Sequence, residues 1–157
     1  MSNIWSLIDQ TGPSALRRAP TKTIAFTGAA GLGAVGDITV WTITGRVLVC
    51  WLTAFCTENF VSAGGGTVSL GTATRVTKFI ASATATTLNI NEWWVDGTPI
   101  TEAVNVINQT TNGSDPSQMN VNISSDVIID VLTANVTDGT LVFDCWYLPV
   151  TSNGSLA

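Results

Sequence analysis

The sequence predicts an all-β protein: a single antiparallel β-sandwich of jelly-roll type with an extended N-terminal arm. Three observations lead to this fold class. No stretch keeps an apolar period of 3.6 residues, about eight or nine short segments alternate in twos between turn signals, and residues 37–58 form two contrasting strand patterns.

Residues 37–58, DITVWTITGRVLVCWLTAFCTE, predict a central hairpin with its turn at Thr44-Gly45, because glycine takes a positive φ at no steric cost. Residues 38–44 alternate, which is typical of a strand with one solvated face. Residues 47–57 are apolar on both faces, with Leu48, Cys50, Leu52, Ala54 and Cys56 set against Val47, Val49, Trp51 and Phe55. Such a strand needs cover on both sides, so the hairpin predicts a second layer.

The remaining elements follow from alternation and from glycine and proline punctuation. Further strands are expected at residues 22–27, 60–63, 67–70, 75–82, 88–95, 100–107, 120–123, 126–132 and 140–150. Gly71, Asp96-Gly97 and Asp138-Gly139 are expected to separate strands. The domain organisation is then an arm at residues 1–20, a sandwich at 21–150 and a flexible tail at 151–157.

The arm has too little apolar surface to fold alone, so it is either disordered or docked on a neighbour. Trp5 favours docking, because a tryptophan is wasted unless it fills a pocket. In the pair Trp93-Trp94, adjacent strand residues face opposite ways, so one ring is expected in the core and the other at a sugar platform or a subunit interface. The low charge favours the interface. The expected partner-binding residues are Trp5, Leu7, Ile8, Arg17, Arg18, Trp93 and Trp94.

Charged residues make up 11% of the chain, against about 25% in typical domains, and the mean hydropathy is +0.35. The longest apolar run is about ten residues, where a membrane-spanning helix needs about 20, so no membrane is expected as a partner. The surface is therefore expected to be covered by other protein, in an obligate oligomer or a coat. The net charge of −5, with six Lys and Arg, excludes nucleic acid as a partner.

Residues 31–36, GLGAVG, match the dinucleotide-binding pattern, but the β-branched residues that follow predict a strand where the phosphate-binding helix would start. We interpret the loop as a close approach of backbones. The N-terminus does not resemble a secretory signal, which indicates synthesis in a reducing cytosol. Cys50, Cys56 and Cys145 are expected to be buried free thiols acting as small apolar residues.

Catalytic chemistry has little support in the sequence. The chain has no histidine, which removes the usual nucleophile–histidine arrangements and histidine-containing zinc sites. Asp126 and Asp130 would lie about 13 Å apart along one strand, too far for a glycosidase pair. The other candidate acids, Glu92, Asp96 and Glu102, are expected in turns and at edges, without the ligand spacing of a calcium site. No enzyme activity and no cofactor are expected.

Residues 23–60 resemble structural proteins encoded with the head genes of tailed bacteriophages. The likeness is carried by a strand ending in FTG, the glycine loop, the TGRVLV turn and the AFCTE close. Beyond Phe60 it is one of composition. The resemblance implies a virion protein: a capsid decoration or cement protein with a jelly-roll fold, made in the host cytoplasm. Such proteins sit as trimers on the outer surface of the shell, over the major capsid protein. The alternative is a tail or fibre module that binds host glycans through Trp93 or Trp94.

Overall fold

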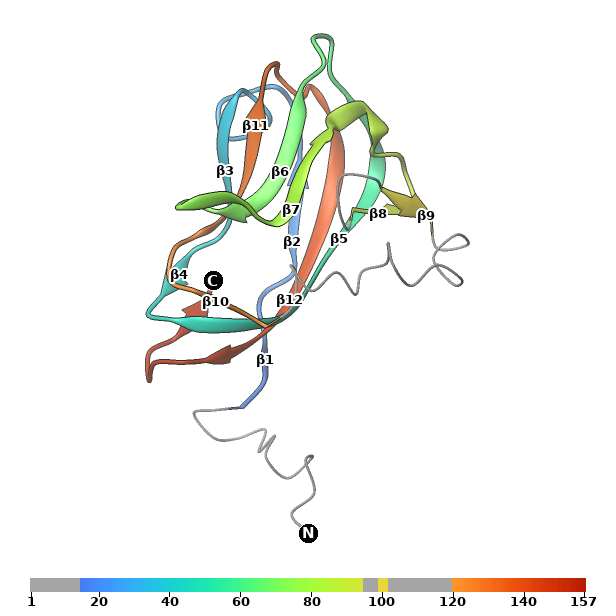
Figure 1. Ribbon diagram of the computed structural model, residues 1–157. Coiled ribbons are helices and arrows are strands. Elements are labelled where there is room, and N and C mark those ends of the chain that lie inside the picture. Colours follow the sequence, from blue (N-terminus) through green and yellow to red (C-terminus); the bar gives the residue numbers. More distant parts are fainter. Residues whose placement is uncertain (1–14, 95–98, 102–119) are drawn as a thin grey trace.

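Two antiparallel sheets form the protein in the computed structural model, which describes residues 15–94, 99–101 and 120–157 (Figure 1). The seven-stranded sheet has the order β1-β12-β5-β8-β9, with β2 also paired to β12 and β10 to β5. Its strands are β1 Arg17–Arg18, β2 Lys22–Ala25, β5 Val47–Val61, β8 Glu92–Trp93, β9 Ile100–Thr101, β10 Val121–Ile123 and β12 Asp138–Pro149. The long antiparallel pair of β5 and β12 is the centre of this sheet.

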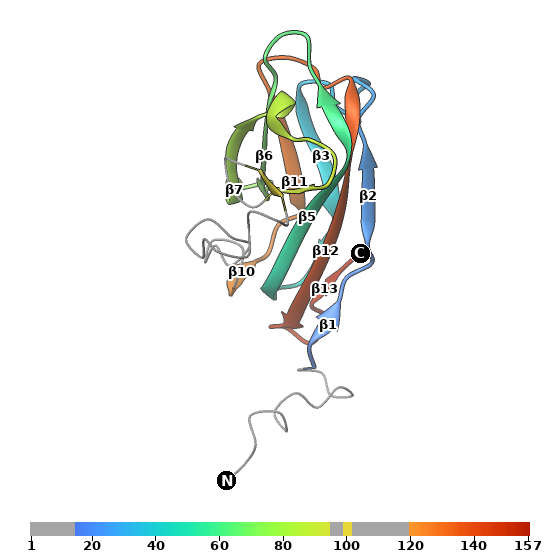
Figure 2. The same ribbon diagram turned by 90° about the vertical axis from the view of Figure 1, so that its right-hand side faces the viewer.

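The four-stranded sheet has the order β3-β11-β6-β7. Its strands are β3 Gly36–Trp41, β11 Val127–Leu132, β6 Thr67–Thr72 and β7 Arg75–Thr84. A small third sheet pairs β4 Ile43–Thr44 with β13 Ser155–Leu156, and a 3₁₀ turn covers Ala85–Thr87. Turned by 90°, the molecule shows the strands of the two main sheets as separate layers (Figure 2). The predicted all-β antiparallel sandwich is confirmed, whereas its jelly-roll form stays a prediction.

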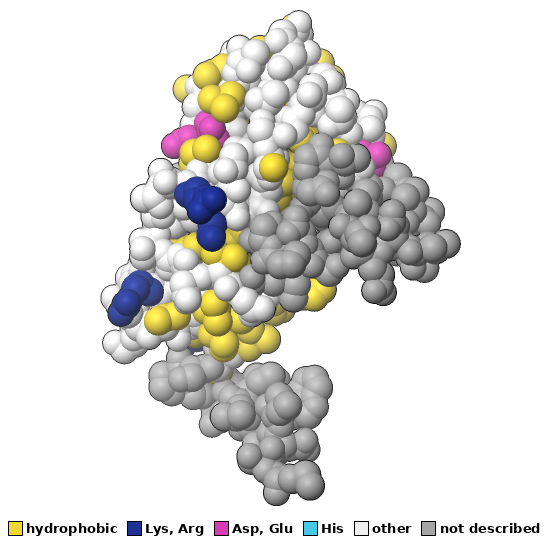
Figure 3. All heavy atoms as spheres, viewed as in Figure 1, with side chains coloured by type: hydrophobic (Ala, Val, Ile, Leu, Met, Phe, Trp, Pro, Cys, Tyr) yellow, Lys and Arg dark blue, Asp and Glu magenta, His cyan; other side chains and the backbone are white. Residues whose placement is uncertain are grey.

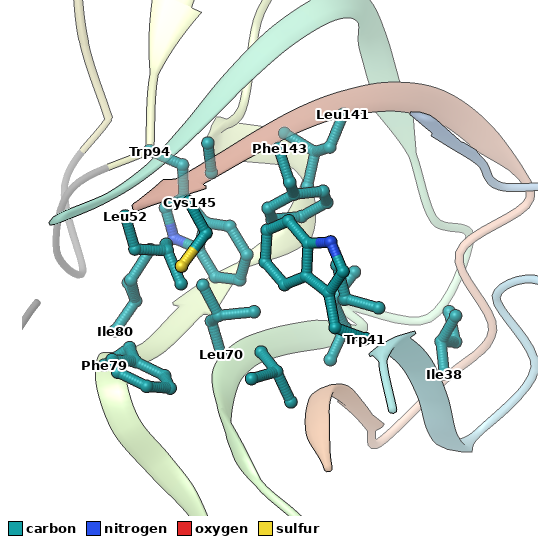
Figure 4. Packing of buried hydrophobic residues seen from close by; sticks show 14 of the residues in the cluster. Ile38, Trp41, Leu52, Leu70, Phe79, Ile80, Trp94, Leu141, Phe143 and Cys145 are labelled. Carbon is teal, nitrogen blue, oxygen red and sulfur yellow. The ribbon is translucent and has the colours of Figure 1, made fainter. Parts of the chain in front are cut away.

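The core fills the space between the two main sheets (Figure 4). Leu52, Phe143 and Cys145 from the large sheet meet Trp41 and Leu70 from the small one, and all five are at most 1% exposed. The Trp41 ring stands edge-on to Phe143, with ring centroids 6.2 Å apart. Val127, Ile129 and Val131 point into the core from β11.

The predicted central hairpin is wrong. Strand β3 pairs with β11 and strand β5 pairs with β12, so the two segments lie in opposite sheets and Gly45 turns the chain between layers. Gly45 does have the positive φ expected of it, at +68°. A turn signal indicates where the chain bends but not whether the flanking strands pair. Here each strand pairs with a strand far along the chain, and the apolar faces of the two strands stack across the core.

Several element boundaries also differ from expectation. Gly71 lies inside β6, where the backbone of β7 passes so close that a Cβ would meet the carbonyl oxygen of Arg75 at 2.2 Å. Gly139 lies inside β12 at a break in register, with φ +118°, and is not part of a turn. The strand expected at 88–95 shortens to β8. The segments 95–98 and 102–119, with the Asp96-Gly97 turn and Glu102, lie outside the described residues.

Both ends of the expected sandwich domain extend further than the sequence indicated. Arg17–Arg18 of the expected arm form β1, which pairs with Tyr147 and Trp146 of β12. The expected tail includes β13, and its Leu156 is 4% exposed. Main-chain pairing explains both results. A short segment becomes ordered when its backbone groups form hydrogen bonds with the unpaired N–H and C=O groups along the edge of an existing strand.

The glycine loop behaves as the sequence indicated. Gly33 has φ +107°, its carbonyl accepts a hydrogen bond from the Val136 amide at 2.7 Å, and a Cβ there would meet the Val136 carbonyl at 2.2 Å. Strand β3 follows the loop, not a helix. The loop therefore brings two backbones together and lacks the helix that would hold a phosphate.

Candidate partner-binding site

A β-bulge in β5 produces the most distinctive surface of the protein. Trp51 pairs with Trp146 and Val49 pairs with Tyr147, which leaves Cys50 as an extra residue in β5. The bulge shifts the alternation by one, so Cys50 and Trp51 both lie on the outer side of the large sheet. The predicted face assignment is therefore wrong beyond Val49: Leu52, Ala54 and Cys56 continue the buried face, and Trp51 leaves it.

An open hollow of about 550 Å³ lies over this outer side. We call it the tryptophan groove; its lining residues are Leu16, Cys50, Trp51, Thr53, Trp93, Asp144 and Trp146. Three strands, β5, β8 and β12, contribute all of them except Leu16, which directly precedes β1. Trp51 is 43% exposed and Leu16 is 38% exposed. The volume falls within the range of about 300–1,000 Å³ that is usual for ligand sites.

The pair Trp93-Trp94 divides between surface and core as the alternation predicted. Trp94 is fully buried and points into the space between the sheets (Figure 4). Trp93 pairs with Phe55 on the outer side of the sheet, with ring centroids 4.7 Å apart, and lines the groove. Trp94 is therefore placed where a partner cannot touch it without unfolding the chain, whereas Trp93 is available for contact.

An ion pair closes the edge of the groove nearest β1. The Arg18 guanidinium contacts the Asp144 carboxylate at 2.6 Å and lies 5.5 Å from the centre of the Trp146 ring. Thr21 donates a hydrogen bond to the same Asp144 oxygen at 2.6 Å. Burial acts to raise the pKa of Asp144, but the hydrogen bonds from Thr21 and Arg18 and the Arg18 charge outweigh it and lower the pKa below its ordinary value. Both charges at this edge are thus already satisfied.

The thiol in the groove adds to its apolar character. Burial raises the pKa of Cys50, with a smaller opposing effect from the backbone of Leu148, so the thiol is protonated at neutral pH. Burial also raises the pKa of Cys56 to about 11 and that of Cys145 to about 12. All three cysteines are free, as predicted, but only Cys56 and Cys145 are buried; the bulge places Cys50 on the outer side of the sheet, where it is partly exposed.

The lining of the groove is largely apolar. Among its lining residues only Thr53 and Asp144 are polar, and Asp144 is engaged by Arg18 and Thr21. Within the described part of the chain, no three metal-ligating side chains come together, and no helix is long and apolar enough to span a membrane. The opposite side of the molecule, with β6 and β7 in front, is also mostly uncharged, with Lys, Arg, Asp and Glu at a few separate places (Figure 3).

A second, smaller hollow of about 190 Å³ differs in character. It is polar and lies between β7 and β10, lined by Thr72, Thr74, Arg75, Lys78, Asn122, Ile123, Ser124 and Ser125. The hydroxyls of Thr72, Thr74 and Ser125 bond to one another in a chain, with Oγ–Oγ distances of 3.3 and 3.0 Å. These hydroxyls thus already satisfy part of the hollow's hydrogen-bonding capacity.

The expected partner-binding residues fall into three groups. Trp5, Leu7 and Ile8 lie outside the described residues, so their role stays a prediction. Arg17 is exposed on β1, and Arg18 is held by Asp144. Of the tryptophan pair, only Trp93 lines the groove.

Sequence reasoning missed six of the seven lining residues of the groove, Leu16, Cys50, Trp51, Thr53, Asp144 and Trp146. Cys50 and Trp51 were placed in an apolar strand expected to be covered on both sides. The cross-strand pairing of Trp51 with Trp146 depends on a register that the bulge sets, and no local pattern shows it. The available signal was the abundance of tryptophan, six in 157 residues, in a chain with little charge.

No protein-family model matches the sequence, and no curated protein matches it. Among solved structures, the chain is similar to a chain in the acidic stable capsid structure of Helicobacter pylori bacteriophage KHP30, with 12% sequence identity and a TM-score of 0.38. The match covers 90% of this chain and 98% of that chain. A TM-score at this level establishes neither a common fold nor a common function, so the function is argued from the residues themselves.

Proposed function

We propose that this chain is a non-enzymatic virion protein that decorates and cements the outside of a phage capsid as an oligomer, stabilising contacts between subunits of the major capsid protein. The observation that carries the proposal is the tryptophan groove, an open apolar surface on a chain with 11% charged residues. Contiguous exposed apolar surface of this kind marks sites of protein association. The sequence resemblance of residues 23–60 to phage head proteins supports the same role.

The mechanism would be mechanical. Each copy buries apolar surface against its mates, in a trimer, and against capsid subunits, so the shell cannot expand without exposing that surface to water. Burying one large aromatic side chain removes 150–250 Å², worth at most about 4–6 kcal/mol. An oligomer that binds several points at once multiplies these contacts into a far higher avidity.

Other properties of the chain fit this setting. The three free cysteines suit synthesis in the reducing cytoplasm of a host cell. The chain has no histidine for nucleophilic catalysis, and its net charge of −5 opposes contact with packaged DNA, which favours the outer surface of the capsid.

Binding to capsids that lack the protein tests the proposal. Purified protein should co-sediment with such capsids and raise the temperature at which they rupture. The double variant Trp51→Ala with Trp146→Ala should lose both effects. Leu132→Ala is the matched control, because Leu132 is 44% exposed but lies on β11 of the other sheet. Wild-type protein that leaves capsid sedimentation and rupture unchanged would refute a cement role.

The three tryptophans around the groove also favour a second candidate, a tail or fibre module that binds host glycans. Sugars stack on aromatic rings, and Trp93 is placed for such contact. Sugar binding also needs several polar groups that fix the hydroxyls, and the groove offers only Thr53 unengaged. A glycan array distinguishes the two candidate functions. A glycan-binding module should bind sugars, and its Trp93→Ala variant should not, whereas a cement protein should bind no sugar.

A further inference from the structure

The outer side of β5 lacks the cover that its composition requires. Its inner side is buried against the four-stranded sheet, whereas Trp51 on its outer side is 43% exposed. Within the described residues nothing occupies the 550 Å³ hollow between Trp51, Trp93 and Trp146. An occupant must be apolar and need few hydrogen bonds, because the groove supplies neither a free charge nor a set of polar groups.

The chain itself contains a segment with these properties. Residues 1–14, which the structure does not describe, read MSNIWSLIDQTGPS and include the apolar residues Ile4, Trp5, Leu7 and Ile8. Asp9 is the one charged side chain among the fourteen. A segment with a tryptophan and three aliphatic side chains matches a hollow lined by tryptophan, leucine and an uncharged thiol.

The direction of β1 shows on which side of the domain this segment joins it. Arg18 pairs with Trp146 and Arg17 with Tyr147, antiparallel to β12, so the chain runs towards the Pro149 end of β12 as it is followed back to its start. Figure 1 shows β1 at that end of the domain. Asp144, Thr53 and Trp93 lie in the opposite direction, so the segment would have to reverse to enter the groove of its own chain.

The reach of the segment allows it to enter a neighbour instead. Ala15 follows Ile8 by seven residue steps, which extended chain spans over about 23 Å. Leu16, the last side chain before β1, already lines the groove of its own copy. Copies could therefore pass their arms from one to the next, with each arm starting at the edge of its own groove and ending in the groove of a neighbour, and such head-to-tail contacts close into a ring such as a trimer.

We infer that the tryptophan groove binds the Ile4–Ile8 segment of a second copy of this chain, so that exchanged arms hold the oligomer together. This deepens the proposed function by assigning the arm to a neighbouring copy and not to the capsid. An arm that instead bound the capsid would make the opposite prediction, since deleting it would then leave the oligomer intact.

A complementation experiment without capsids tests the inference. One variant lacks residues 1–14 and keeps its groove; the other keeps its arm and carries Trp51→Ala with Trp146→Ala. Light scattering after gel filtration should show an oligomer for the full chain, a monomer for each variant alone, and a complex when the two variants are mixed. Either an arm-deleted protein that stays oligomeric or a mixture that stays monomeric would overturn the inference.

A synthetic peptide of residues 1–14 provides a second measurement that does not depend on assembly. The dye-labelled peptide should bind the arm-deleted protein, and Trp51→Ala should weaken this binding at least about tenfold, as removal of a central aromatic contact does. Leu132→Ala is the control and should leave binding unchanged. A full chain that is monomeric while the peptide still binds would mean that the arm fills its own groove, which also overturns exchange between copies.

These outcomes are separable from failure of the proposed function. Arm exchange is read from oligomeric state and peptide binding alone, whereas the cement role is read from capsid sedimentation and rupture. An arm-exchanged oligomer that ignores capsids would retain the inference and remove the cement role.

Discussion

The two sides of the β5–β12 pair both carry large apolar residues, but only the inner side is buried. On the inner side, Leu52, Phe143 and Cys145 are at most 1% exposed, because the four-stranded sheet covers them. On the outer side, Trp51 and Trp146 face an open hollow. A strand that is apolar on both faces therefore indicates that both need cover, but it does not indicate whether the same chain supplies it.

The bulge at Cys50 causes this difference in burial between the two sides. Without it, Trp51 would continue the alternation of Val47 and Val49 and enter the core. With it, one large ring moves to the surface and Leu52 takes the buried position. A single extra residue thus moves an aromatic ring from the core to the exposed side of the sheet.

The largest expected effect comes from truncating one ring on each side of β12. Phe143→Ala should lower the free energy of unfolding by about 3–5 kcal/mol, because it leaves a cavity between the sheets. Trp146→Ala should cost about 1 kcal/mol or less, through loss of its contact with Arg18 and some surface packing. Urea unfolding, at concentrations where the chain is monomeric, measures both.

The same measurement can break the comparison. If Trp146→Ala costs as much as Phe143→Ala in the monomer, the outer side is covered within its own chain. The groove would then be an extension of the core and would not serve as an association surface. Loss of stability that appears only at high protein concentration would place the effect in the oligomer.

The fold class could be predicted because it depends on local patterns. Alternation in twos and the absence of a helical period are properties of short windows, and most strand positions follow from them. Strand pairing does not depend on short windows. The expected hairpin between 38–44 and 47–57 is absent because each strand finds a partner far along the chain, β11 for β3 and β12 for β5.

The candidate site was predictable only in part, for the same reason. Trp93 could be found from its neighbour Trp94, because opposite faces follow from adjacency. Trp51 and Trp146 could not, because they meet only after the bulge sets the register of strands 95 residues apart in sequence. The pairing of Asp37 with Asp130 across β3 and β11 was missed likewise.

A smaller effect is expected from the hydrogen bonds of the two tryptophan indoles buried on the inner side. The Trp41 indole donates a hydrogen bond to the Pro20 carbonyl at 2.8 Å, whereas the equally buried Trp94 indole has no acceptor among the described residues. Trp41→Phe loses a bond and leaves a carbonyl unpaired, while Trp94→Phe removes an unpaired donor. We expect Trp41→Phe to cost about 1–3 kcal/mol more in urea unfolding. Equal costs would mean that the Trp94 indole finds an acceptor in the folded protein.

The smallest effect compares the acids on the outer sides of the two sheets. Burial raises the pKa of Asp130 above its ordinary value, and Asp37 opposite it raises the pKa further. Asp130 therefore contributes stability below its unfolded pKa and loses that contribution as the pH rises through its folded pKa. Asp144 has the opposite sign: its lowered pKa contributes stability at neutral pH, which is lost as the pH falls through the folded value.

Asparagine substitutions should therefore give opposite pH profiles. Asp130→Asn should raise the free energy of unfolding at pH 7 by up to about 1 kcal/mol, because like charges directly opposite each other destabilise a sheet, and should have no such benefit at pH 3. Asp144→Asn should lower it at pH 7 by about 1 kcal/mol or less, since the ion pair with Arg18 is partly exposed, and this cost should shrink in acid. Urea unfolding at a series of pH values measures both. Parallel profiles would show that Asp144 is no better compensated than Asp130, and that the groove edge carries a free charge after all.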